Sequence, residues 1–321
     1  MRVFEQIKNY EGQTPVVLSI GNFDGLHLGH QYLLQKNMEL AAHLKARSVL
    51  LSFTPHPLQV IKPELVRVPI LSSKEQELGL EKLGIDDWIK EPFTSQTSQE
   101  SARSFIERIL KSVPVLAIVV GPDFRFGKNR EGDTDLLKVL SEDKTLWQLH
   151  SKASEVPDTA VKAFQVVLPE PYFVLGQRVS SSLVREALLK GEVDRAQTLL
   201  GRSFTLSGKV VSGFRRGRAI GFPTANILSL QAHHLRRGVY LTFATVRGER
   251  RKSVTNIGVH PTFEEDKELQ VETHILDFSE NIYGDELKLE FITFLRPEVK
   301  FKDIEALKTQ IAKDVQFARQ S

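Results

Sequence analysis

The stretch SIGNFDGLHLGH, Ser19 to His30, joins a short apolar run to a long helical pattern. Residues 16–20 are apolar apart from one serine, which is typical of a buried strand, and residues 29–46 carry apolar side chains on one helical face. Glycines in the connection let the backbone approach a ligand closely. The start of the following helix presents free N–H groups and the positive end of the helix dipole. This strand–turn–helix unit predicts an anion site at the carboxyl end of a strand.

Three interpretations are open for His27 and His30, which lie close together in this stretch. The pair could bind a metal ion, donate hydrogen bonds to a phosphate, or consist of two ordinary histidines. A metal site needs at least a third ligand, and the nearest acid, Asp24, is better placed to cap the helix. The glycine turn between strand and helix favours the phosphate interpretation.

The composition is that of a globular protein, with 321 residues, 41% of them hydrophobic and 26% charged. This length accommodates two ordinary domains or one large one. A formal net charge of only +3 argues weakly against a dedicated nucleic-acid binder. The chain has no cysteine, which excludes disulfides, thiolate nucleophiles and cysteine-bound zinc. Because there is no long apolar segment and no signal-peptide pattern, we expect a cytoplasmic protein without a membrane partner.

Short apolar runs alternate with helical patterns through the first half of the chain. We expect strands at residues 16–20, 48–53, 88–89 and 115–120, and helices at 29–46, 73–83 and 98–111. This alternation predicts a parallel sheet covered by helices on both faces.

The second half has a different pattern, with short strands that follow one another without helices between them. We expect strands at residues 204–211, 238–246, 253–258, 270–276 and 287–295, and a closing helix at 302–319. Sequential strands of this kind predict an antiparallel barrel or sandwich. We expect two helices, at about residues 182–189 and 192–200, to bridge the two halves.

Two further motifs of the first half suit phosphate chemistry. GPDFRFG, residues 121–127, follows an expected strand, and RVSSSLVR, residues 178–185, combines hydroxyls and arginines at an expected helix start. Hydroxyl and backbone donors together with guanidinium groups are typical of phosphate binding. Serines at a helix start are also common caps, and that alternative remains open for Ser181 and Ser182.

The second half carries a glycine-rich basic loop, GFRRGR, followed by PTAN and, further on, VETHI. The loop can cradle phosphates, although it is not a Walker A loop, and a charged hairpin turn is the alternative. Thr224 and Asn226 offer oxygen atoms suited to Mg²⁺, and such residues are otherwise ordinary next to proline. Glu272 could accept a proton from an attacking hydroxyl, or could simply lie on the polar face of a strand.

These motifs together resemble one enzyme family. HLGH resembles the HxGH signature of the nucleotidyltransferase superfamily, and GNFDGLHLGH, FTPHP, GPDFRFG and RVSSSLVREAL are similar to motifs of the bacterial bifunctional riboflavin kinase/FMN adenylyltransferases, or FAD synthetases. Residues 208–226 resemble the family's flavokinase motif, and NIGVHPTF, VETHILDF, NIYGDEL and LRPEVKF follow in the family's order. The resemblance runs from about residue 16 to residue 301.

The resemblance implies a fold and two reactions. The fold is a Rossmann-like α/β nucleotidyltransferase domain with a parallel sheet, residues 1–185, followed by an antiparallel β-barrel flavokinase domain with a C-terminal helix, residues 186–321. The second domain would phosphorylate riboflavin to FMN with ATP, and the first would adenylylate FMN to FAD with release of pyrophosphate. ATP, riboflavin, FMN and FAD are then the substrates and products, with Mg²⁺ as the cofactor.

The resemblance also assigns roles to residues. Glu272 matches the catalytic base of the kinase, His27 and His30 would act on the transferring phosphate, Asp123 and Phe124 would contact the flavin, and Thr224 and Asn226 would position Mg²⁺ and ATP. The nucleotide-binding residues would be Gly21, Asn22, Phe23, Gly29, Ser181, Ser182, Arg185, Gly213, Arg218, Gly221, Thr224 and Asn226.

Two departures and two alternatives accompany the resemblance. The family often has threonine where this chain has Ser182, and commonly has an acid where it has Thr54, which leaves the role of the FTPHP loop open. Another HxGH enzyme is disfavoured because no KMSKS-like lysine loop is visible. A nucleic-acid-binding protein is disfavoured by the modest charge and the lack of an interleaved aromatic and basic stripe. We therefore expect small-molecule partners and no nucleic acid, and the sequence gives no indication of the oligomeric state.

Overall fold

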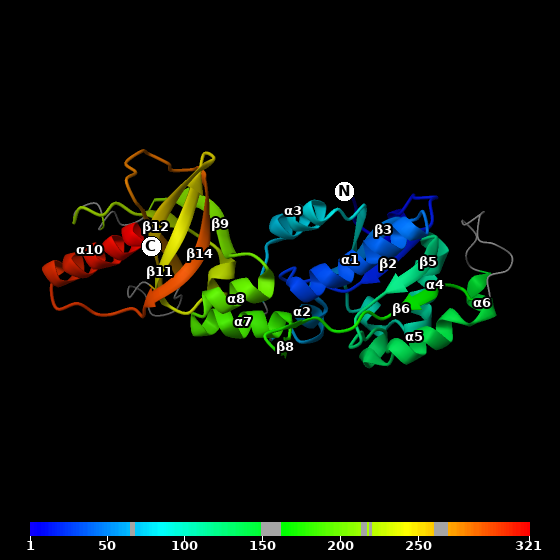
Figure 1. Ribbon diagram of the computed structural model, residues 1–321. Helices are drawn as coiled ribbons and strands as arrows, with labels where there is room; N and C mark the ends of the chain where they lie inside the picture. The colour runs from blue at the N-terminus through cyan, green and yellow to red at the C-terminus, as the bar shows by residue number, and fades with distance from the viewer. Residues whose placement is uncertain (65–67, 149–161, 213–216, 218–219, 260–268) are drawn as a thin grey trace. The chain divides into compact units, whose positions relative to one another are not determined.

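The computed structural model describes the whole chain except residues 65–67, 149–161, 213–216, 218–219 and 260–268. The chain divides into two compact units (Figure 1). The first unit comprises Met1–Arg67 and Leu71–Val179, and the second comprises Val68–Ile70 and Ser180–Ser321. The boundary predicted after residue 185 falls inside helix α7, Ser181–Lys190, which belongs to the second unit.

The first unit contains a six-stranded parallel sheet in the order β1-β4-β3-β2-β5-β6. The strands are β1 Arg2–Phe4, β2 Val16–Ile20, β3 Arg47–Thr54, β4 Asp87–Pro92, β5 Val115–Val119 and β6 Gln165–Val167. Every neighbouring pair in this sheet is parallel. The predicted parallel α/β architecture is therefore confirmed, and β1 and β6 are two strands that the pattern did not indicate.

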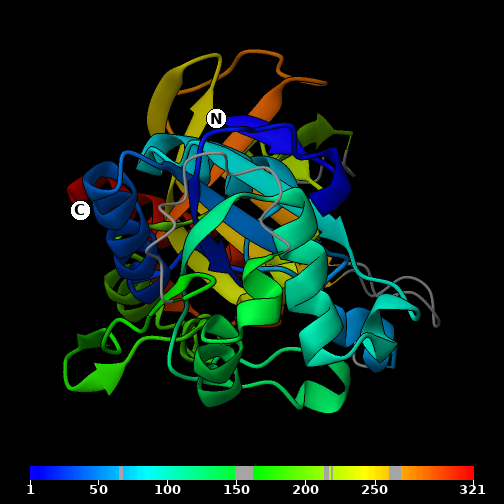
Figure 2. The same cartoon turned by 90° about the vertical axis from the view of Figure 1, so that its right-hand side faces the viewer.

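Helices cover both faces of this sheet, as Figures 1 and 2 show for α1 and α4. The helical segments of the unit are η1 Ile7–Asn9, α1 Leu28–His43, α2 Pro57–Ile61, α3 Ser73–Leu83, η2 Thr97–Gln99, α4 Ala102–Ser112, η3 Lys128–Arg130, α5 Thr134–Ser141 and α6 Lys144–Trp147. A small antiparallel hairpin, β7 Phe173–Val174 with β8 Gln177–Arg178, precedes the second unit.

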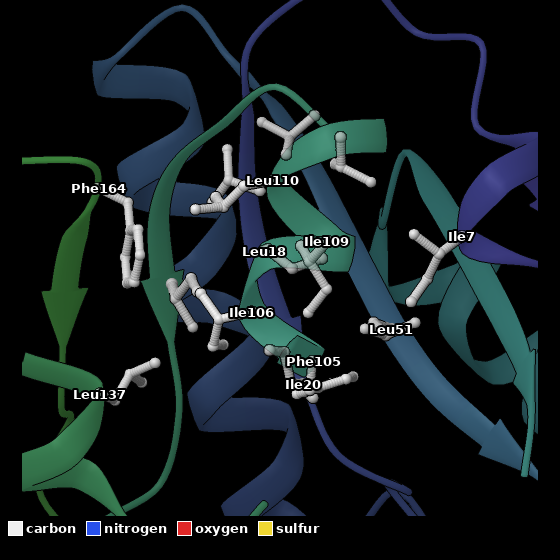
Figure 3. Packing of buried hydrophobic residues seen from close by; sticks show 14 of the residues in the cluster. Ile7, Leu18, Ile20, Leu51, Phe105, Ile106, Ile109, Leu110, Leu137 and Phe164 are labelled. Carbon is white, nitrogen blue, oxygen red and sulfur yellow. The ribbon is translucent and has the colours of Figure 1, made fainter. Parts of the chain in front are cut away.

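Alternation along β2 distributes its side chains between two cores, because successive residues of a strand point to opposite faces. Leu18 and Ile20 pack in a large cluster with Phe105 and Ile106 of α4 (Figure 3). Val17 packs instead with Ala41 of α1. Burial of both faces explains why the strand reads as a continuous apolar run.

The helix ends follow from local chemistry. Ser72 and Glu75 form a capping box at the start of α3, and Gly84 ends that helix in the left-handed conformation. The helix expected from residue 98 begins only at Ala102, because the Ser101 side chain accepts a hydrogen bond from Ser104 N and caps the helix there.

A charged cluster joins the amino ends of β1, β3 and β4. The buried Asp87 carboxylate accepts two hydrogen bonds each from Arg2 and Arg47, at 2.7–2.8 Å. Burial raises the pKa of Asp87, but the hydrogen bonds from the two arginines outweigh burial and lower this pKa to about 2. The cluster holds the edge strand β1 in the sheet.

The second unit is a closed antiparallel barrel in the order β10-β13-β12-β11-β14-β9, with β9 paired to β10 to complete it. The strands are β9 Phe204–Val211, β10 Ala225–Ile227, β11 Gly238–Val246, β12 Glu249–Val259, β13 Leu269–Ile275 and β14 Glu286–Arg296. The accompanying helical segments are α7 Ser181–Lys190, α8 Val193–Leu200, η4 Leu230–His234 and α10 Ile304–Gln320. Of the predicted barrel and sandwich, the barrel is the one observed.

The barrel strands alternate between an interior and an outer face. Phe204, Tyr240, Ile257 and Phe291 are almost fully buried, and Phe204 and Phe291 lie opposite each other across the β9–β14 pair. The outer face of β11 and β12 is also covered, because Val239, Leu241 and Val254 form an apolar cluster with Ala318 of α10. In the described part of the chain, no helix combines the length and apolarity needed to cross a bilayer.

Candidate functional sites

The connection between β2 and α1 carries the first site and is conformationally unusual. Phe23 (φ 51°), Gly25 (φ 85°) and Leu26 (φ 43°) all adopt left-handed backbone angles. For the two non-glycine residues this costs free energy. Both have buried side chains that pack in a cluster with Leu34 and Trp88, and this packing holds the connection in place.

His27, not Asp24, is the N-cap of α1. Its Nδ1 accepts a hydrogen bond from the backbone N–H of His30 at 3.2 Å. The prediction that Asp24 caps this helix is wrong, because the loop turns once more before the helix begins at Leu28. A ring nitrogen that accepts a hydrogen bond carries no proton, so the neutral His27 ring has its proton on Nε2. In this tautomer the ring nitrogen that can donate is Nε2.

The rings of His27 and His30 stack, with centroids 3.6 Å apart and planes inclined by 16°. Phe23 contacts the His30 ring at a centroid distance of 5.0 Å. Burial lowers the pKa of His30 well below its usual range, and the nearby His27 lowers it further. His30 is therefore neutral at pH 7 and offers one N–H donor rather than a cationic charge.

Two buried polar atoms of this stretch have no hydrogen-bond partner within the described chain: His30 Nδ1 and Asn22 Oδ1. Buried polar atoms are nearly always paired in folded proteins, and exceptions are common where a ligand binds. The backbone carbonyl of Asn22 is engaged, since it accepts a hydrogen bond from Gln76 at 3.0 Å. The geometry therefore marks this connection as a place for a ligand.

Gly21 and Gly29 make room for side chains of the protein itself. A Cβ on Gly29 would lie 3.2 Å from the His27 ring and 3.4 Å from Val179 O. A Cβ on Gly21 would lie 3.1 Å from the Phe23 ring. Glycine at these two positions lets the rings fold back against the backbone, which is how His27 reaches its capping position.

The metal interpretation of the histidine pair gains no support. Within the described residues, no group of three or more histidine or acidic side chains is arranged to hold a metal ion. The phosphate interpretation needs only donors, and the site offers the His27 Nε2–H and the free N–H groups of the α1 start.

The GPDFRFG segment follows β5, as expected, and contacts the β7–β8 hairpin. Asp123 forms an ion pair with Arg178 at 2.5 Å. Phe124 stacks on Phe126, with centroids 5.2 Å apart. No feature here tests the predicted flavin contacts of Asp123 and Phe124.

The serine-rich helix start is α7, in the second unit. Ser180 takes the cap position, and its hydroxyl accepts from Leu183 N at 3.2 Å. Ser181 and Ser182 therefore occupy the first turn without being the cap. The Arg185 guanidinium lies 3.5 Å from the carbonyls of Ser181 and Val68.

The barrel brings Asn226, Glu272 and Asn256 together on one face. Asn226 of β10 lies directly opposite Glu272 of β13, and Glu272 lies directly opposite Asn256 of β12. Directly opposed residues of antiparallel strands point to the same face and lie close together. Strand register thus forms a row of three polar side chains from segments far apart in the sequence.

Two cavities meet at this row. One, of about 500 Å³, is lined by interior barrel residues and by the loop after β13, including Val210, Thr273 and Tyr283. The other, of about 570 Å³, is a groove between the outer face of the barrel and α10, lined by Glu272 and by apolar residues such as Val254 and Leu307. Thr224 and Asn226 line both cavities.

Two contacts shape the groove. Arg296 of β14 forms an ion pair with Asp314 of α10 at 2.8 Å, which fastens the helix to the barrel. His274, two residues after Glu272 on the same face, donates from Nδ1 to Pro223 O at 2.8 Å. This bond anchors the segment that leads to Thr224. His274 and Asn256 are two groove residues that the sequence motifs did not indicate, although both lie at alternating strand positions within those motifs.

Two residues predicted to bind nucleotide in the glycine-rich basic loop, Gly213 and Arg218, lie outside the described residues. Gly221 is described, and its left-handed backbone (φ 90°) forms part of the turn into Thr224.

Known proteins match both units. A family model described as FAD synthetase matches residues 9–162, and one described as riboflavin kinase matches residues 200–321. A protein of Listeria monocytogenes named bifunctional riboflavin kinase/FMN adenylyltransferase is 34% identical over 306 residues, which cover 94% of this chain and 91% of that protein. A protein of Escherichia coli with the same name is 33% identical over 310 residues, covering 96% and 93%.

One solved structure resembles the chain over nearly its full length. It is described as a macrolide-efflux protein from Streptococcus pneumoniae, and it has a TM-score of 0.84 and 26% identity, covering 99% of this chain and 98% of that one. The likeness supports the fold of both units, and the matches in sequence decide the family.

Proposed function

The chain belongs to the family of bifunctional riboflavin kinase/FMN adenylyltransferases, and we propose that it makes FAD from riboflavin in two reactions at two separate sites. The barrel carries the kinase reaction, and the α/β unit carries adenylyl transfer. The observation that carries the proposal is the meeting of two cavities at Thr224 and Asn226, with Glu272 directly opposite Asn226.

In the kinase reaction, riboflavin occupies the groove beside α10. ATP occupies the other cavity, which is lined by interior barrel residues and the loop after β13. The apolar walls of the groove suit a flavin ring system, and Glu272 lines the groove but not the other cavity. Glu272 accepts the proton of the ribityl 5′-hydroxyl as its oxygen attacks the γ-phosphorus of ATP. The bond from that phosphorus to the β-phosphate oxygen breaks, which gives FMN and ADP.

Thr224 and Asn226 are the residues that would hold Mg²⁺ together with the ATP phosphates. They offer a hydroxyl and an amide oxygen, the hard oxygen ligands that Mg²⁺ prefers, and both line the two cavities. When bound, the ion would neutralise charge on the phosphates. Neither side chain makes a hydrogen bond with another described residue, so both are available for this role.

In adenylyl transfer, the phosphate of FMN attacks the α-phosphorus of ATP, and pyrophosphate leaves. A phosphate dianion needs no general base, so the site supplies position and donors. The His27 Nε2–H and the N–H of neutral His30 donate to the transferring group, and Gly21, Asn22, Phe23 and Gly29 form the connection that holds them.

We propose that the functional division of the chain stays at residues 185 and 186. Ser181, Ser182 and Arg185 at the α7 start would hold the triphosphate, which makes the first turn of this helix part of the adenylyl-transfer machinery. Asp123 and Phe124 would contact the flavin in the same reaction. Another HxGH enzyme or a nucleic-acid-binding protein is not favoured, because both family matches and the named relatives point to flavin chemistry.

The deciding experiment is incubation of the protein with riboflavin, ATP and Mg²⁺, followed by chromatographic separation of riboflavin, FMN and FAD. We expect FMN to appear first and FAD to follow, and omission of Mg²⁺ to stop both. Absence of FMN would reject the kinase reaction. FMN without FAD, also when FMN is supplied, would confine activity to the barrel.

A further inference from the structure

The row Asn226–Glu272–Asn256 continues across the barrel to Val239, because Asn256 lies directly opposite Val239 of β11. The polarity of the side chains changes along this row. Asn226 borders both cavities, Glu272 and Asn256 border the groove alone, and Val239 belongs to the apolar cluster under α10. The groove is therefore polar beside the cavity proposed for ATP and apolar at Val239, and beyond Val239 the row continues to Arg296, which is ion-paired with Asp314.

Riboflavin has the same order of parts. Its reactive hydroxyl ends a chain of further hydroxyls, and that chain leads to the ring system. With the 5′-hydroxyl at Glu272 and the ring on the apolar side, the remaining ribityl hydroxyls pass Asn256. Neighbouring strands lie about 4.8 Å apart, so the amide is within reach of the hydroxyls next to the reactive one.

Asn256 is free to make such a contact. It is half-buried, and its side chain makes no hydrogen bond with any other described residue. Its Nδ2 lies against Gly258, where a Cβ would be only 3.1 Å away. The amide offers both donors and an acceptor, so it can pair with a hydroxyl in either direction.

We propose that Asn256 binds a ribityl hydroxyl beside the reactive one, and so makes the kinase site selective for a polyhydroxylated flavin side chain. This inference rests on the proposed kinase function of the barrel. A site that pairs with a substrate hydroxyl discriminates strongly against an analogue without it, because the polar group of the site is then left without a partner. Asn256 would thus be a specificity-determining residue that touches substrate, distinct from the base Glu272.

The test compares two substrates in two proteins. The substrates are riboflavin and an analogue whose side chain is a plain 5-hydroxypentyl group, which keeps the reactive hydroxyl and lacks the others. The proteins are the full-length wild type and Asn256→Leu, which has a side chain of similar size without polar atoms. Values of kcat/KM come from phosphorylation assays, and flavin fluorescence titration gives the same comparison for binding.

We expect the wild type to prefer riboflavin and Asn256→Leu to lose about 10- to 100-fold in kcat/KM for riboflavin. The rate with the analogue should be nearly unchanged, which also shows that the variant is folded. Gln270→Leu is the matched control in the same groove. Asn256 lies directly opposite Glu272, whereas Gln270 lies opposite Gly258, away from the reactive hydroxyl. This variant should therefore change kcat/KM by the same factor for both substrates.

Two results would overturn the inference. One is an equal loss with both substrates in Asn256→Leu, which would make Asn256 a structural residue. The other is a wild type that does not distinguish riboflavin from the analogue. If the wild type phosphorylates neither substrate, the proposed kinase function itself fails, and that outcome differs visibly from the other two.

Discussion

The two sites of this chain are built from different kinds of structure. In the α/β unit, the side chains proposed to act lie on a loop and on the first turn of a helix, and they hold one another: His27 caps the helix through His30 N and stacks on the His30 ring. In the barrel, Asn226, Glu272 and Asn256 come from three strands and are placed by the backbone ladder. A substitution in the first site should therefore affect both stability and activity. A substitution in the second site should affect activity with little effect on stability.

The largest expected effect is that of Glu272→Ala on the kinase reaction. Loss of the base that accepts the ribityl proton should reduce FMN formation by roughly 100-fold or more. The backbone ladder does not depend on this side chain, so thermal unfolding of the barrel should change little. FMN formation from riboflavin, measured by chromatography, and FAD formation from supplied FMN are the two assays.

Glu272→Gln provides the matched control for size and polarity, and it should be as inactive as the alanine variant. FAD formation from FMN should continue at the wild-type rate in both. Equal impairment of both reactions in a folded variant would contradict the assignment of separate sites.

His30→Ala should have the opposite pattern, with a reduction of about 100-fold in FAD formation from supplied FMN, because one donor to the transferring phosphate is lost. FMN formation by the barrel should continue. The same two assays measure the effect. Retained FAD formation would show that the buried, unpartnered Nδ1 of His30 marks no catalytic site.

Much of the fold follows from the sequence, because long amphipathic or apolar segments leave little choice. The strand at residues 204–211 and the capped helix at 73–83 were predicted with the observed bounds. The edge strand Arg2–Phe4 could not be predicted. It is three residues long, and it is held by the pairing of Arg2 with Asp87, which is distant in the sequence.

Some features of the candidate sites could likewise be predicted from the sequence, and others could not. Residue types and motif order made Glu272 and the histidines candidates, but the neighbourhood of Asn226, Glu272 and Asn256 depends on strand register. Register is set by pairing across the whole barrel, so alternation within one segment cannot supply it. The cap role of His27 also escaped prediction, because it depends on left-handed backbone angles at Phe23 and Leu26, which those residue types rarely adopt.

A smaller effect separates the two roles of His27. His27→Asn keeps a side-chain acceptor for His30 N, whereas His27→Ala removes it, and loss of an N-cap costs about 1 kcal/mol of stability. Both variants lose the Nε2–H donor. Both should therefore lose FAD formation to a similar degree, while only the alanine variant unfolds at lower denaturant concentration. If His27→Asn were fully active, the role of His27 would be capping alone.

The smallest expected effect is a dependence of stability on pH that originates at His30. Because burial holds the pKa of His30 well below its usual value of 6.5, the unfolded chain binds a proton there below about pH 6.5 that the folded chain does not bind. Stability that is present at neutral pH is therefore lost as the pH falls through the unfolded pKa. His30→Gln removes this contribution. The free energy of unfolding of His30→Gln, measured relative to wild type by denaturant titration, should therefore increase as the pH is lowered from 7.5 to 5.5. The increase should be less than about 1 kcal/mol at pH 6. A constant difference across this range would mean that the pKa of His30 is the same in the folded and the unfolded protein, so that burial does not hold the folded ring neutral.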